Sequence, residues 1–109
     1  MIAQSVCDEL VNGILDALGG NVLAIVLYGS VARGTEGPDS DIDIAVIVRE
    51  RIDEWENDRL SDAVVDLDLR YGKVFSVVDI EDGTYREWRN TLPFYRNVEQ
   101  EGIVLWQAA

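Results

Sequence analysis

Apolar positions in the first half of the chain follow two different periodicities. Between residues 2 and 18 they recur every four positions and a glycine pair follows, which predicts an amphipathic helix. Residues 22–28, VLAIVLY, form a continuous apolar run that is typical of a strand covered on both faces. After Gly29 and Ser30 the segment VARG predicts the first turn of a short helix, and residues 41–48 predict a second strand.

The second half of the chain continues this alternation of helices and strands. The pattern predicts a helix over 52–71, a strand over 74–80, a further helical piece up to Gly102 and a short strand over 103–106. Thr84 and Glu87 have the spacing of a capping box, so a short helix is expected to begin there and to be interrupted at Pro93.

The order of these elements indicates the fold class. Helices alternate with short strands and no repeat or linker interrupts them, which predicts an α/β (α+β) fold with a small mixed β-sheet flanked by helices. The length of 109 residues fits one domain spanning 1–109.

Composition restricts the chemistry that the chain can perform. It contains no histidine, which removes Ser-His and Cys-His catalysis and imidazole metal sites, and Cys7, its only cysteine, is expected to be a small buried apolar residue. No apolar run has the length of a membrane span, so no membrane contact is expected. Acidic residues come too early for a secretory signal, which favours a cytoplasmic protein.

The net charge of −12 argues against non-specific nucleic-acid binding, which needs a basic surface to neutralise phosphates. Two explanations of this charge stay open. One is a basic protein partner. The other is a halophilic host, since acidic surfaces keep proteins soluble in a high-salt cytoplasm, and Lys73 is the only lysine among nine basic residues.

Two aspartates at the start of the predicted second strand are candidate metal ligands. Asp41 and Asp43 share one strand face, about 6.6 Å apart at a rise of about 3.3 Å per residue. Unpaired carboxylates so placed repel and raise each other's pKa, and a bound Mg²⁺ would relieve this conflict. The alternative is a solvated entrance to the strand, as is common in an acidic chain.

The turn before the short helix is a candidate phosphate site. Gly29 lets the backbone approach a ligand closely, the Ser30 hydroxyl adds a hydrogen bond, and Arg33 lies one turn further on. The alternative is a plain strand-to-helix turn. The combination with the two aspartates is more specific than either feature alone.

The segments YGSVARG and PDSDIDIAVIV together resemble the nucleotidyltransferase superfamily of DNA polymerase β type, and most closely its small minimal nucleotidyltransferases. The resemblance implies the nucleotidyltransferase fold and a nucleoside triphosphate substrate. By the resemblance, Gly29 and Ser30 hold the β- and γ-phosphates, and Asp41 and Asp43 bind two Mg²⁺ ions. A phosphate contact from Arg33 is an inference from its position.

Active members of this superfamily usually carry a third carboxylate on a later strand, where it completes the metal site and can act as base. The best candidate is Asp79, which alternates with Phe75 and Val77. The alternative is that Asp79 marks the exposed end of its strand. Asp66 and Asp68 are weaker candidates.

The resemblance implies transfer of AMP from ATP to a hydroxyl of a HEPN-type partner protein, with the chain acting as an antitoxin. An alternative is an inactive binding module that neutralises a basic partner by occlusion. A third reading is transfer to a small molecule such as an aminoglycoside, although no acceptor-binding domain is evident. Assembly into a homo-oligomer stays open.

Overall fold

A four-stranded mixed sheet forms the centre of the molecule, with strand order β3-β2-β1-β4. The computed structural model describes residues 2–37 and 39–109. In chain order the elements are α1 (Gln4–Leu18), a 3₁₀ turn η1 (Gly19–Asn21), β1 (Val22–Tyr28), α2 (Gly29–Arg33), β2 (Ile42–Val48), α3 (Glu54–Tyr71), β3 (Phe75–Glu81), α4 (Asp82–Trp88), α5 (Pro93–Glu101) and β4 (Ile103–Gln107). Strand β1 pairs antiparallel with β2 and β4, whereas β2 and β3 are parallel. The predicted mixed sheet flanked by helices is confirmed.

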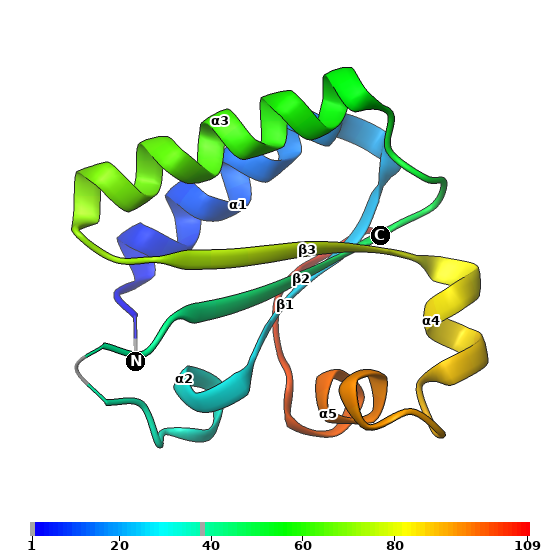
Figure 1. Ribbon diagram of the computed structural model, residues 1–109. Coiled ribbons are helices and arrows are strands. Elements are labelled where there is room, and N and C mark those ends of the chain that lie inside the picture. The colour runs from blue at the N-terminus through cyan, green and yellow to red at the C-terminus, as the bar shows by residue number, and fades with distance from the viewer. Residues whose placement is uncertain (1, 38) are drawn as a thin grey trace.

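Helices cover both faces of the sheet. Figure 1 shows α1 and α3 together on one side, and α2, α4 and α5 on the other. On the first side, Leu10 and Ile14 of α1 and Leu60 of α3 pack against Ile44 of β2, and all are buried. On the second side a smaller cluster joins Ala45 and Ile47 of β2 to Tyr85 of α4 and Val98 of α5. Strands β1 and β2 are therefore apolar on both faces, as their sequences predict.

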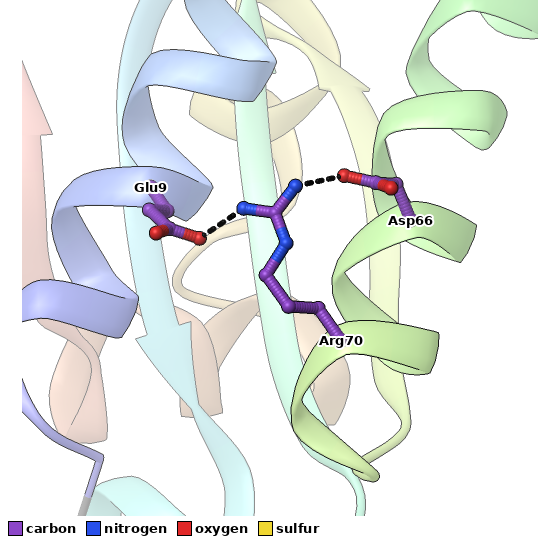
Figure 2. Close-up of polar contacts among 3 residues, drawn as sticks. All are labelled: Glu9, Asp66 and Arg70. Atoms are coloured by element: carbon purple, nitrogen blue, oxygen red, sulfur yellow. Dashed lines mark hydrogen bonds and ion pairs between the residues drawn. The ribbon is translucent and has the colours of Figure 1, made fainter.

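The two helices of the first layer are also joined by an ion pair at their outer surface, and a second pair lies within α3. Arg70 of α3 donates to Glu9 of α1 at 2.6 Å and to Asp66, one turn earlier on its own helix, at 2.5 Å (Figure 2). All three side chains are substantially exposed, so these pairs contribute little to the stability of the fold.

One local prediction about the helices is wrong. Helix α4 begins at Asp82, without a side-chain cap, so Thr84 lies inside the helix and forms no capping box. The capping box lies instead at the start of α3, where the Asp53 carboxylate accepts from the Glu56 amide at 2.7 Å and the Glu56 carboxylate accepts from the Asp53 amide at 3.1 Å.

Two further residues differ from the sequence-based expectation. Trp55, one of the residues whose spacing predicts a single packed face for the helix over 52–71, is 65% exposed, with the Arg59 guanidinium 4.8 Å from the centre of its ring. Cys7, expected to be buried, is partly exposed. Within the described part of the chain, no helix is both long and apolar enough to cross a membrane.

Candidate active site at the junction of β1, α2 and β2

The candidate site forms where β1 ends and β2 begins. Because these strands are antiparallel, Tyr28, the last residue of β1, is the direct cross-strand partner of Asp43. Helix α2 begins at the next residue, Gly29, so the glycine-rich turn and the carboxylates lie side by side although a loop separates them in sequence. The structure thus brings together the two motifs that the sequence singled out.

The closest relationship in the site is that between Gly29 and Asp43. Gly29 has a φ of +76°, a conformation that side-chain-bearing residues rarely adopt. A Cβ at this position would collide with the Asp43 carboxylate and would lie only 3.3 Å from the Asp43 Cβ. Only glycine therefore lets the Asp43 side chain lie directly against the turn that opens α2.

Asp43 and Asp41 differ in their surroundings. Asp43 is the second residue of β2 and is half-buried, whereas Asp41 is exposed and precedes the strand. Burial, reinforced by the negative charge of Asp41, raises the pKa of Asp43 above its usual 3.8, and Arg33 opposes this rise. The mutual repulsion predicted for the two carboxylates is therefore present at Asp43.

Arg33 lies near the site but is already engaged. Its guanidinium forms an ion pair with Glu101 of α5 at 3.0 Å, and both side chains are substantially exposed. Its opposing effect on the pKa of Asp43 shows that it also acts electrostatically on the carboxylates. A phosphate contact from Arg33 would compete with the Glu101 pair.

The structure does not bring Asp79 to the other carboxylates. On the parallel neighbour strand, Asp43 is in register with Ser76, and Asp79 is in register with Val46. Asp79 lies about 10 Å further along β3, at about 3.3 Å per residue, and on the opposite face of the sheet. There it lines a hollow with Asn57 and Val64 of α3. We therefore leave Asp79 out of the candidate site, as an exposed residue on the α3 side.

Two residues near the carboxylates were not among the site residues predicted from the sequence. Ser76 is the β3 residue that shares both level and face with Asp43, and it is partly buried. Lys73, the only lysine, lines a hollow of about 190 Å³ beside Asp41, together with Asp39 and Ser40. Ser76 follows from the alternation of side chains along β3 once the register with β2 is known; sequence alone does not give that register.

The donor set suits one hard divalent cation rather than a complete protein cage. Among the described residues, no group of three or more acidic, cysteine or histidine side chains is positioned to hold a metal ion. Mg²⁺, however, commonly uses one or two carboxylates and completes its shell with water and substrate phosphates. Asp41 and Asp43, whose charges repel each other, fit that arrangement.

Comparison with known proteins identifies the family to which the chain belongs. Residues 8–104 match the family described as the nucleotidyltransferase domain. A protein of Methanocaldococcus jannaschii, named as a candidate protein adenylyltransferase, is 31% identical over 106 residues, which cover 97% of this chain and 100% of that protein.

Solved structures share the fold. A toxin–antitoxin complex crystallised with AMP-PNP superposes with a TM-score of 0.63 at 21% identity, over 94% of this chain and 73% of the matched one. The complex of the tri-AMPylated HEPN toxin of Shewanella oneidensis with its MNT antitoxin gives 0.59 at 19% identity, over 96% and 72%. With the family match spanning almost the whole sequence, this chain belongs to the nucleotidyltransferase domain family.

Proposed function

We propose that this chain transfers AMP from ATP to a hydroxyl group of a HEPN-type partner protein, as the antitoxin of a toxin–antitoxin pair. The observation that carries the proposal is the contact between Gly29 and Asp43, which sets a carboxylate against the turn that, by the resemblance, holds phosphate. The name of the archaeal relative and the AMPylated toxin in a complex of the same fold support the choice of AMP and of the partner.

In the proposed reaction each residue of the site has a separate task. The Gly29 backbone and the Ser30 hydroxyl hold the β- and γ-phosphates, while Arg33 leaves Glu101 to contact a phosphate oxygen. The acceptor oxygen attacks the α-phosphorus, and the bond from that phosphorus to the pyrophosphate oxygen breaks. The proton of the acceptor hydroxyl is released to solvent water, because Asp43 is proposed to hold Mg²⁺ and a bound cation favours the charged form of its carboxylate.

Mg²⁺ is the cation that this site is proposed to hold. Asp41 and Asp43 would bind it, and when bound it offsets the negative charge of the triphosphate and of the leaving pyrophosphate. One ion is satisfied by these two carboxylates and phosphate oxygens. A second ion, implied by the resemblance, would draw its remaining ligands from the substrate and water.

The acidic character of the chain fits the proposed partner. A net charge of −12 favours association with a basic protein, and HEPN ribonucleases must bind the phosphates of RNA. A cytoplasmic setting, where ATP and such a partner would meet, is part of the same proposal.

The direct test measures transfer to the natural partner. The chain is incubated with a HEPN-type protein from the same genome, Mg²⁺ and ATP labelled at the α-phosphate. Label is expected on the partner, is expected to disappear with EDTA, and is expected to fall at least about hundredfold in Asp43→Asn. Asp79→Asn, which removes a carboxylate from the other face of the sheet, serves as the matched control and should retain transfer. Absence of label with the wild-type chain would contradict the proposal.

A second candidate function is favoured by the separation of Asp79 from the other two carboxylates. If two carboxylates do not suffice for catalysis, the chain would neutralise a basic partner by covering it. The double variant Asp41→Asn/Asp43→Asn distinguishes the two functions. Loss of neutralisation with the complex intact supports transfer, whereas full neutralisation by this variant supports occlusion.

A further inference from the structure

Three aromatic side chains form a cluster at the edge of the candidate site. The rings of Tyr28 and Phe94 meet edge to face, with centroids 5.5 Å apart and planes at 89°. Phe94 makes a similar contact with Tyr95, at 5.2 Å and 83°. Such edge-to-face pairs are favourable and hold ring orientations in place.

The cluster is anchored to the carboxylates through Tyr28. Tyr28 and Asp43 are direct cross-strand partners, so their Cβ atoms lie about 4.5–5.5 Å apart on the same face of the sheet. The pKa of Tyr28 is raised, mainly by burial and in part by the charge of Asp43, which agrees with this proximity. Tyr28 thus links the phosphate end of the site to α5.

Phe94 is the member of the cluster that a ligand can reach. It is 40% exposed, whereas Tyr28 and Tyr95 are partly buried against the core on that side of the sheet. Pro93 at the first position of α5 fixes the backbone immediately before Phe94. An exposed ring held by two aromatic neighbours, next to a triphosphate site, is a suitable surface for a flat aromatic ligand.

We propose that Phe94, held in place by Tyr28 and Tyr95, stacks against the nucleobase of the triphosphate whose phosphates lie at Gly29 and Ser30. This inference rests on the proposed function and extends it to the recognition of the nucleoside. Stacking on a single ring recognises the π-face that every base has, and it reads no hydrogen-bonding pattern. The Phe94 ring should therefore contribute equally to the binding of ATP and of GTP, so Phe94→Ala should weaken the binding of both by a similar factor.

The test compares two ligands that share the triphosphate and differ in the base. Binding of ATP and of inorganic tripolyphosphate, each with Mg²⁺, is measured by titration calorimetry on the full chain. Phe94→Ala is expected to weaken ATP binding roughly tenfold, the order expected for one lost stacking contact, and to leave tripolyphosphate binding unchanged. Phe94→Trp should restore ATP binding. Leu92→Ala, at an equally exposed apolar residue beside α5, is the matched control and should change neither ligand.

The outcomes separate this inference from the proposed function. Equal ATP affinity in Phe94→Ala and the wild type, or equal weakening of both ligands, would overturn the stacking role while leaving the triphosphate site in place. Weakening of ATP binding in Phe94→Ala with GTP binding unchanged would also overturn it. A wild-type chain that binds neither ligand would overturn the proposed function, and the stacking role with it.

Discussion

The Asp43 side chain fills the space into which a side chain at Gly29 would project. The two residues belong to different elements, Gly29 to the start of α2 and Asp43 to β2. Because of this contact, the backbone of the turn limits where the carboxylate can lie. A substitution at either residue should therefore change the conformation of the other.

Gly29→Ala should destabilise the protein and abolish binding of Mg²⁺ and ATP. A positive φ costs a residue with a side chain about 1–3 kcal/mol, and the new methyl group would also displace the Asp43 carboxylate. The free energy of unfolding from urea titration measures the first effect, and calorimetry measures the second.

Gly34→Ala provides the matched control for this substitution. Gly34 has nearly the same φ, +75°, but a Cβ there would meet nothing within 4 Å. Gly34→Ala should lower the free energy of unfolding only by the strain of its positive φ, and it should leave the binding of Mg²⁺ and ATP unchanged. Equal losses of stability and binding in both variants would show that the contact with Asp43 is unimportant.

Asp43→Asn should raise the melting temperature of the metal-free protein at pH 7. The folded-state pKa of Asp43 lies above 3.8, so folding favours the protonated carboxyl. Protonated Asp43 makes its full contribution to the free energy of unfolding below about pH 3.8. This contribution is lost as the pH rises through the raised pKa of the folded state. The gain from Asn should therefore be a few degrees at pH 7 and should vanish toward pH 4.

With Mg²⁺ and ATP added, the wild type should have a higher melting temperature than Asp43→Asn. The wild type should gain melting temperature from the ligands, since binding to the folded state alone stabilises it, and Asp43→Asn should gain little. Differential scanning fluorimetry across pH, with and without ligands, measures both effects. A variant less stable than the wild type at pH 7 without ligand would contradict the assigned cause of the pKa shift.

Ser76→Asp should tighten Mg²⁺ binding. Ser76 is level with Asp43 on the adjacent strand, so the new carboxylate would add a third ligand on the same face. We expect an affinity about tenfold higher, and a further rise in the pKa of Asp43 from the added negative charge. Calorimetric titration with Mg²⁺ measures the affinity. Ser61→Asp, at an exposed position of α3, adds the same charge far from the site and should leave the Mg²⁺ affinity unchanged.

Glu101→Gln should strengthen triphosphate binding by releasing Arg33. The pair at 3.0 Å is exposed and weak, so a gain of only severalfold is expected. Arg33→Ala should weaken binding, and the added Glu101→Gln should then have little effect. Additive effects of the two substitutions would mean that the ion pair does not control Arg33.

The strands are the part of the fold that the sequence predicts best, because each is a dense apolar run. The prediction of residues 22–28 coincides with β1, and the prediction of 41–48 exceeds β2 by the single residue Asp41. Helix starts were less predictable: the spacing of Thr84 and Glu87 fits a capping box, but α4 begins earlier because Asp82 continues directly from β3. Spacing shows where a cap could form, and tertiary packing decides whether it does.

The carboxylate pair and the glycine turn could be predicted because each lies within a short segment. The register between β2 and β3 could not be predicted from the sequence. Alternation correctly places Asp79 on the face of Phe75 and Val77, but only the register shows that Asp43 shares its face with Ser76. A shift of one residue between the strands would have placed Asp79 on the face of Asp43.

The pairing of β1 with β4 determines when the site can be completed during synthesis. Residues 24–27 pair with residues 103–107, so the sheet closes a loop that contains most of the chain. While the chain is still emerging from the ribosome, β1 has no neighbour on that side, and α5, which carries Phe94, has no β4 to follow it. A nucleotide-competent surface therefore forms only after residues 103–107 have been synthesised and have paired with β1, although the carboxylates lie in residues 41–43.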